Sequence, residues 1–545
     1  MNHWIILPVV LPAMLAAAMT LLARFQPGVE RALSLGGLIA FLGVALGLAW
    51  QASDGAVTIY QLGAWQAPFG IVLVADRLST YMVLLLAILS FLVMLHAIGS
   101  GWDKRGRHFH PLFHFQIMGI AGAFLTGDMF NLFVFFEVLL IASYGLLVHS
   151  GGATRVRIGT QYVLYNLLGS TLFLFALGTL YAETGTLNMA DLAGRVAMID
   201  PGASASIRVA AVLLLLVFAV KAALLPLHFW LPGAYAEAPG PVAALFAIMT
   251  KVGAYGIIRV YTMIFPPDLE VTAGLHGVWL MPLALISLAV GMIGVLAAAR
   301  LERLVAFAVV GSMGMVMTAI ALMSEAGLAA ALYYIAHSTF ATAALFLVVD
   351  IVRERRGAGG RIEGAAPMVG GPLLAGLFFV AAIAMTGLPP LSGFLGKLLI
   401  LDAAFDSPLM AWVWTVVMAS SLVAVLGFAR AGSAVFWKPQ QIVQDMARKA
   451  PSEEDISETE REPQGHSTPR LPLVAVGGFV GLLLLLTVFA GPMTAYMRAM
   501  VDQLVDPQAY ISRTLETPGK EITHGHYDDE TDGDDAADTD AEGGH

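Results

Sequence analysis

Long apolar runs separated by short polar loops fill most of this 545-residue chain. A helix needs about 20 apolar residues to cross the hydrocarbon core of a bilayer. Runs of this length predict an all-α integral membrane protein of about fourteen transmembrane helices. They fall near residues 4–23, 31–50, 72–98, 111–126, 128–149, 161–182, 207–236, 241–264, 274–299, 303–324, 328–350, 371–404, 408–437 and 472–495.

Composition supports lipid as the solvent of this chain. Hydrophobic residues make up 58% of it and charged residues only 12%, whereas soluble domains carry about 25% charged residues. The net charge of −10 comes from acidic clusters late in the chain, which gives nucleic-acid binding no support. Because there is no cysteine, disulfides, thiolate zinc sites and cysteine-held iron–sulfur clusters are excluded, and we expect no cofactor.

The N-terminus resembles a signal peptide, but it lacks a basic start and its apolar run is too long, so we interpret it as a retained helix. Basic residues favour the cytoplasmic side of membrane proteins. We therefore predict that both termini lie outside. In this orientation the outer loops contain few basic residues, namely Arg77, Arg195, Arg208 and Arg259. The inner loops then hold Arg24, Arg31, Lys104, Arg105, Arg107, Arg155, Arg157, Arg300, Arg303, Arg353, Arg355, Arg356, Arg361, Lys438, Arg448, Lys449, Arg461 and Arg470.

Two stretches are too polar to span a membrane. Residues 439–470 form a polar cytoplasmic linker before the last helix at 471–498, and residues 499–545 form an acidic tail that we expect to be disordered. A weak metal site in the tail is the alternative to a solvated segment, since it contains His524, His526 and His545.

Prolines and glycines interrupt two of the apolar runs. Pro226 follows Lys221, and Gly387, Pro389 and Pro390 precede Lys397. Proline breaks a helix, and freed backbone groups are tolerated at membrane depth only where protein or a water-filled cavity satisfies them. The broken segments are the seventh and twelfth of the predicted helices. Because they are five helices apart, an odd number, the chain crosses the membrane in opposite directions at the two breaks, as in transporters with inverted repeats. The alternative is a pair of ordinary proline kinks.

This pattern predicts a domain organisation around two five-helix bundles. Residues 1–110 form the first three helices, residues 111–265 the first bundle and residues 274–438 the second. Each bundle then contains one discontinuous helix.

Five ionisable residues lie inside apolar runs: Glu137, Lys221, Lys251, His337 and Lys397. Glu137 is nine residues into its helix, about 13 Å deep at the helical rise. A charge at the bilayer centre costs roughly 2.5–3.5 kcal/mol, so these groups should face the protein interior and find partners. Lys221 could instead extend toward a helix end, His337 could only bond a neighbouring helix, and Glu137 could be a structural partner of a lysine.

Other charged groups fit the membrane boundary better. Asp350 and Glu325 sit at helix ends beside polar loops, and we expect them at the interface. Arg300, Glu302 and Arg303 form a loop cluster that would anchor the boundary. No nucleophile–base arrangement or phosphate-binding loop stands out. Burial moves carboxylates and lysines toward proton exchange near neutrality, so the five buried groups predict proton translocation rather than catalysis.

Three motifs resemble a known family. The segments GDMFNLFVFFEVLLIASYGLLVH, KAALLPLHFWLPGAYAEAPGPVAALFAIMTKVGAYGIIR and GLPPLSGFLGK are similar to the antiporter-like proton channels. This family includes the large membrane subunits of respiratory complex I and the A and D subunits of Mrp-type antiporters. The similarity covers about residues 60–430, and FNLFVFFE and LPPLSGFLGK are most similar to the D subunits.

The resemblance implies a fourteen-helix core with two inverted five-helix bundles. It implies an ion pair between Glu137 and Lys221, relay roles for Lys251 and His337, and terminal proton handling by Lys397. The chain departs from the family at Thr342, where a lysine is common, and at Asp350, where a small residue is common.

The resemblance also implies a secondary transporter subunit of the bacterial inner membrane, moving H⁺ against Na⁺ or K⁺ within a complex of other hydrophobic subunits. One rival is a proton-pumping subunit of a quinone-reducing complex or membrane hydrogenase. The other is a non-transporting scaffold, for which Glu137→Gln and Lys221→Ala would leave ion movement intact. No set of sodium ligands can be recognised by spacing.

Overall fold

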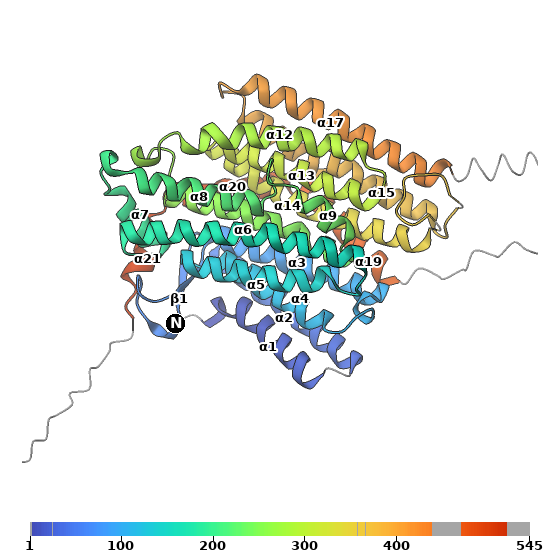
Figure 1. Cartoon of the computed structure of the whole chain (residues 1–545), viewed down its shortest axis with the longest axis horizontal. Helices are drawn as coiled ribbons and strands as arrows, with labels where there is room; N and C mark the ends of the chain where they lie inside the picture. Colours follow the sequence, from blue (N-terminus) through green and yellow to red (C-terminus); the bar gives the residue numbers. More distant parts are fainter. Residues whose placement is uncertain (1–2, 24–25, 357, 366, 439–469, 520–545) are drawn as a thin grey trace, which may run out of the picture.

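The computed structural model describes residues 3–23, 26–356, 358–365, 367–438 and 470–519. Most of its helices run side by side along one direction, as Figure 1 shows. The first half contains α1 (Leu7–Leu22), α2 (Pro27–Ala52), α3 (Arg77–Ser100), α4 (Phe109–Leu125), α5 (Met129–Leu147), α6 (Ala153–Thr184), α7 (Met189–Ala197), α8 (Ala205–Lys221), α9 (Trp230–Glu237), α10 (Gly240–Leu245) and α11 (Met249–Met263). The second half contains α12 (Leu275–Ala297), α13 (Leu301–Ala321), α14 (Glu325–Arg355), α15 (Gly371–Thr386), α16 (Ser392–Ala403), α17 (Met410–Gly432), α19 (Arg470–Val488), α20 (Ala490–Val505) and α21 (Gln508–Glu516).

Among the described residues, ten helices are long and apolar enough to cross a membrane. Three further apolar helices, α1, α4 and α15, are shorter. The prediction of a mostly helical, multi-pass membrane protein is therefore confirmed. The number of fourteen crossings and the inverted repeats stay predictions.

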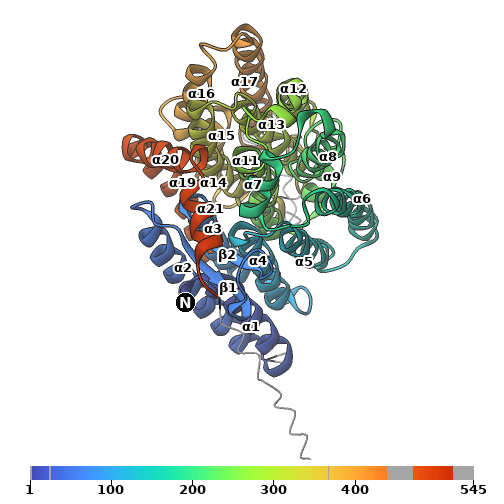
Figure 2. The same cartoon turned by 90° about the vertical axis from the view of Figure 1, so that its left-hand side faces the viewer.

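Helix α14 forms the centre of the molecule. Every residue from Gly327 to Val352 is buried, and α14 packs against α3, α10, α13, α15, α16, α19 and α20. Figure 2 shows α1 and α2 at one edge and α17 at the opposite edge. A helix enclosed on all sides can hold polar groups away from lipid, which makes α14 the natural place for an internal site.

At three breaks between helices of the described chain, side chains bond backbone groups beside the break. Between α8 and α9, around Pro226, the indole of Trp230 donates to the carbonyl of Val220 at 3.0 Å. The amide of Leu225 donates to Ser287 Oγ at 2.8 Å. Between α15 and α16, around Pro389 and Pro390, Lys397 Nζ donates to the carbonyl of Thr386 at 2.6 Å. At both breaks, therefore, protein side chains supply hydrogen bonds to the backbone, as is required where no bulk water is present.

The third interruption was not predicted. The run at 472–495 divides into α19 and α20 at Phe489, and the hydroxyl of Tyr333 on α14 donates to the carbonyl of Leu486 at 2.9 Å. The predicted boundary of the last helix at 498 is wrong, because α20 continues to Val505 and α21 follows it. The rest of the tail, with His524, His526 and His545, and nearly all of the linker lie outside the described residues.

The chain also contains short elements that the apolar pattern missed. Strand β1 (Thr58–Gln61) pairs antiparallel with β2 (Val72–Ala75), so the apolar run at 72–98 is a strand followed by a helix. The amphipathic helix α7 follows α6. These elements and α21 lie together at one end of the bundle, on the left in Figure 1.

This end, which we call the Asp76 end, contains a buried ion pair. Asp76 caps α3 by accepting from the amide of Ser79 at 2.8 Å, and Arg259 of α11 lies 2.7 Å from its other carboxylate oxygen. Arg259 was expected in an outer loop, but it is inside α11 and only 4% exposed. The arginine side chain reaches back into the protein because Asp76 offers it a bidentate partner.

Replacing Arg259 by Met should destabilise the fold by about 3–5 kcal/mol, because it leaves the Asp76 charge buried without a counter-charge. The thermal midpoint of the purified protein in detergent should fall accordingly. Asp76→Asn/Arg259→Met should recover much of the loss, since it removes the unpaired charge and keeps an N-cap residue. A double variant as unstable as the single one would contradict this interpretation.

Candidate functional site

Glu137 and Lys221 both contact α6, through partners one turn apart. The hydroxyl of Ser170 donates to Glu137 Oε1, and Lys221 Nζ donates to Asn166 Oδ1 at 3.2 Å. Asn166 and Ser170 are one turn apart on α6, and Ser170 Oγ lies 3.2 Å from the carbonyl of Asn166. Within the described part of the chain no direct ion pair joins Glu137 and Lys221, so the expected ion pair is a bridged arrangement in this structure.

Lys221 is positioned by the end of its half-helix. It is the last residue of α8, is 6% exposed, and its ammonium lies 5.3 Å from the centroid of the Phe136 ring. A cation near an aromatic face and at a helix C-terminus is stabilised by both. The side chain therefore points into the protein and does not extend toward water.

Lys251 and His337 form the central part of the site. Lys251 of α11 is completely buried, and among the described residues its ammonium has no hydrogen-bond partner. His337 of α14 has its Nδ1 2.9 Å from Ser392 Oγ, at the start of α16, while its Nε2 has no partner within the described chain. Buried polar groups are almost always hydrogen-bonded, through ordered water where protein offers nothing.

More unpaired polar atoms surround these two residues. Thr250 Oγ1, Tyr334 Oη and Thr342 Oγ1 are buried and find no partner in the part of the chain that the structure describes. They lie on the same two helices as Lys251 and His337. The arrangement is the one that internal water would satisfy, and Thr342, which replaces the expected lysine, can bond such water but cannot carry a charge.

Lys397 belongs to the second long break. Its ammonium donates to the carbonyl of Thr386 and, at 2.7 Å, to Ser421 Oγ on α17. Thr386 ends α15, so the lysine neutralises the negative end of a half-helix. Gly387 lies under the lysine, and a Cβ there would come within 2.5 Å of Lys397 Cδ. The sequence located this lysine but not its partners Thr386 and Ser421.

Sequence reasoning also missed Asn166 and Ser170. A signal was available, since Tyr162, Asn166 and Ser170 recur every four residues along α6. This spacing places them on one helix face.

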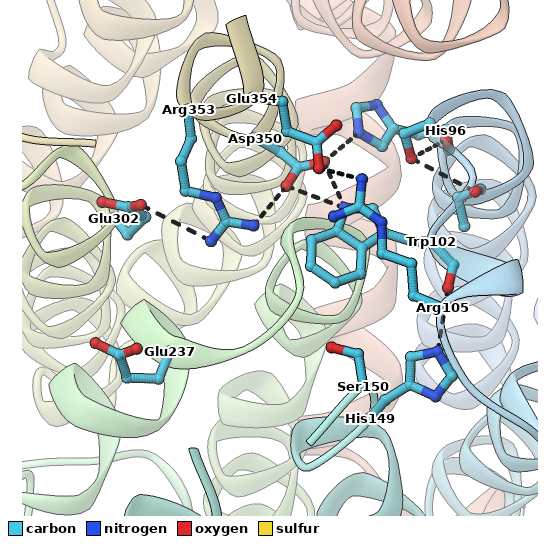
Figure 3. Close-up of polar contacts among 12 residues, drawn as sticks. His96, Trp102, Arg105, His149, Ser150, Glu237, Glu302, Asp350, Arg353 and Glu354 are labelled. Atoms are coloured by element: carbon cyan, nitrogen blue, oxygen red, sulfur yellow. Dashed lines mark hydrogen bonds and ion pairs between the residues drawn. The ribbon is translucent and has the colours of Figure 1, made fainter. Parts of the chain in front are cut away.

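Two boundary residues behave differently from expectation. Asp350 was expected at the interface but is only 2% exposed, because His96, Trp102 and Arg353 enclose it, as Figure 3 shows. Arg300 and Glu302 do form a cluster, with a separation of 3.5 Å. Among the described residues no group of three or more His, Cys, Asp or Glu side chains could hold a metal ion.

Lysines buried beside interrupted helices, together with a half-buried carboxylate, are typical of membrane subunits that translocate ions. Residues 126–426 match the family model described as "NADH:quinone oxidoreductase/Mrp antiporter, TM". The chain belongs to this family.

The relatives are antiporter D subunits. The chain is 36% identical to the D subunit of a probable K(+)/H(+) antiporter from Rhizobium meliloti (strain 1021), over 95% of this chain and 98% of that protein. It is 35% identical to the D subunit of a Na(+)/H(+) antiporter from Alkalihalophilus pseudofirmus, over 94% of this chain and 100% of that protein.

Solved structures agree on the fold. A chain of the Mrp complex from Dietzia sp. DQ12-45-1b has a TM-score of 0.82 at 26% identity, covering 94% of this chain and 100% of that one. A chain of respiratory complex I from Thermus thermophilus has a TM-score of 0.73 at 25% identity, covering 92% and 99%.

Gly393→Ala should destabilise the second break. Its added methyl group would collide with the carbonyl of Ala384 and lie 2.9 Å from His337 Nε2. Overpacking of this kind typically costs about 1–3 kcal/mol, so the thermal midpoint in detergent should fall. Gly376→Ala is the control, since no atom lies within 4 Å of its added methyl group. Equal stability of the two variants would contradict the close packing of α16 against His337.

Proposed function

We propose that this chain is the proton-translocating D subunit of a multisubunit monovalent cation/H⁺ antiporter driven by the proton-motive force. Sodium is the expected cation, with potassium as an alternative, because relatives of both names match nearly the whole chain. The observation that carries the proposal is a series of ionisable groups on α5, α8, α11, α14 and α16. Lys221, Lys251, His337 and Lys397 are buried, and Glu137 is half-buried.

The bridged arrangement around α6 supplies a switch. Lys221 bonds Asn166 while Glu137 bonds Ser170, so a small movement of α8 would exchange the amide partner for the carboxylate. A lysine next to a carboxylate holds its proton, and one removed from it releases the proton more readily. Ion movement that changes this separation would therefore drive a proton from Lys221 onward.

Lys251 and His337 then continue the line toward the second break. The free Nζ of Lys251 and Nε2 of His337 lie among hydroxyl groups that lack protein partners in the described chain. Proton transfer through such a line needs only hydrogen-bonded water and changes no covalent bond between heavy atoms. Lys397, held by Thr386 and Ser421, is the last group of the line.

The architecture that we propose has fourteen crossings and two inverted repeats, at residues 111–265 and 274–438, after the three helices of residues 1–110. The interruptions of α8–α9 and α15–α16 support it, since each carries a lysine. We place the chain in the bacterial inner membrane with both termini outside, because the basic loops then face the cytoplasm. Its partners would be other hydrophobic antiporter subunits.

A redox-driven proton pump is the second candidate, and the likeness to a complex I chain favours it. The two candidates differ in the source of energy. Full-length coverage by D subunits named as antiporters supports the first.

Glu137→Gln should abolish antiport. The amide still accepts from Ser170 but offers Lys221 no charge. The complete complex would be expressed in everted vesicles that lack other antiporters, and sodium or potassium addition should dissipate a preformed pH gradient. We expect a loss of at least tenfold, equivalent to about 1.4 kcal/mol or more in the barrier, with normal protein level.

Glu183→Gln, an exposed carboxylate at the end of α6, serves as the matched control and should remain active. Cation-linked dissipation that survives Glu137→Gln would refute the proton line. Acidification that requires NADH or hydrogen oxidation, with no response to either cation, would establish the redox candidate instead.

A further inference from the structure

A second buried polar cluster, drawn in Figure 3, is absent from the proton line above. It lies around the C-terminal end of α3, whereas Asp76 caps the N-terminal end of that helix, and we call this end of the bundle the Asp350 end. The centre of the cluster is Asp350, near the end of α14. Its carboxylate lies 3.0 Å from His96 Nε2 on α3, 2.9 Å from Trp102 Nε1 and 3.2 Å from the guanidinium of Arg353. Asp350 is 2% exposed and His96 is completely buried.

The partners of Asp350 fix where the proton of His96 sits. Indole and guanidinium groups only donate, and an ionised carboxylate only accepts. His96 must therefore donate through Nε2, as in other carboxylate–histidine pairs. Its Nδ1 is then the atom that can accept a proton.

That nitrogen is unused by the protein. His96 Nδ1 is buried and has no hydrogen-bond partner among the residues described by the structure. A buried polar atom without a partner calls for an explanation.

Trp102 covers the His96–Asp350 pair and is itself only 3% exposed. The guanidinium carbons of Arg105, Arg353 and Arg155 lie 4.0, 5.5 and 5.9 Å from the indole ring centroid. Arg105 pairs with Glu354, and both are about one-third exposed, at 39% and 31%. Three guanidinium groups around the indole disfavour the entry of a metal ion.

The covering loop is itself anchored. Asp103, next to Trp102, lies 2.6 Å from Arg31 Nε and 3.4 Å from His110 Nε2. Burial acts to raise the pKa of Asp103, but the hydrogen bonds from His110 and Arg31 outweigh it and hold that pKa below its usual range. Because its pKa is depressed, Asp103 stabilises the loop at neutral pH, and that stabilisation is lost only as the pH falls through its folded-state pKa.

Asp350 lies on the same helix, α14, as two residues of the central part of the site. Asp350 is eight residues from Thr342 and thirteen from His337, which is about 12 Å and 20 Å along α14. Between them the rings of Phe346 and Tyr235 lie 6.2 Å apart. Gly240, the first residue of α10, has no room for a Cβ beside Asp350. An aromatic pair therefore packs on the stretch of α14 between Thr342 and Asp350.

We propose that His96, oriented by Asp350, exchanges protons between the proton line described above and the aqueous phase at the Asp350 end. This inference rests on the proposed function and on its orientation, which makes this end cytoplasmic. Nδ1 takes up a proton from the line, Asp350 balances the charge of the imidazolium, and the same nitrogen gives the proton to water that enters past Trp102. One N–H bond forms and the same bond breaks, so no other reactant is needed.

The test uses the complete complex in everted vesicles, whose outer medium bathes the cytoplasmic face. His96→Gln keeps an amide that can donate to Asp350 but cannot carry a proton. We expect the maximal rate of cation-dependent pH-gradient dissipation to fall at least tenfold. The half-saturating cation concentration and the amount of assembled complex should stay unchanged. The rate should become more sensitive to replacement of H₂O by D₂O, because proton exchange now limits it.

Two further variants separate transport from packing. Asp350→Asn should also slow transport, and the double variant should be no slower than His96→Gln, because Asp350 acts through His96. His149→Gln alters a buried histidine whose Nε2 lies 3.1 Å from the carbonyl of Trp102 in the same layer, and it should remain active.

Each other outcome has a definite meaning. A His96→Gln rate within twofold of the wild type would overturn the assignment, as would an equal loss in His149→Gln, which would indicate packing of the Trp102 loop alone. If the wild-type complex shows no cation response, the proposed function itself fails. If it responds and only Glu137→Gln is inactive, the proton line stands without His96.

Discussion

Hydrocarbon offers no hydrogen bonds, and this constraint governs the whole molecule. Every backbone group freed by an interrupted helix needs a partner from the protein or from water in an internal cavity. Trp230 and Ser287 provide partners at the first break, Lys397 at the second and Tyr333 at the third. The breaks therefore do not weaken the fold. They bring polar side chains to membrane depth and hold them there.

The same constraint draws attention to buried polar atoms that have no hydrogen-bond partner in the described protein. Among the described residues, α11 and α14 are enclosed by other helices and each carry three buried side chains with an unpaired polar atom, and α4 carries three more. Glu137 and Lys221, in contrast, each have a partner on α6. In one part of the site, around α6, the side chains have protein partners. In the other part, on α11 and α14, water would have to supply the hydrogen bonds. Proton movement needs both, since it requires a defined switch and a medium that can rearrange.

Sequence reasoning succeeded where the signal is local. Apolar runs predict helices, and a lysine beside a proline within such a run marks a break. It failed where the role of a residue depends on contacts with residues far away in the sequence. Asp350 looked like a boundary residue because its partner His96 is 254 positions away. The strand at Val72–Ala75 was merged with α3 because both are apolar, and only pairing with Thr58–Gln61 distinguishes them.

The last helices have a consequence for biosynthesis. Tyr81 of α3 donates to the carbonyl of Leu332 on α14 at 3.0 Å, and α19 and α20 pack against both of these helices. The wall around α14 thus joins an early segment of the chain to one of the latest. During synthesis the ribosome must release almost the entire polypeptide before that wall can close. Until then the bilayer has direct access to the flank of α14, so the final helices complete the insulation of the protein interior.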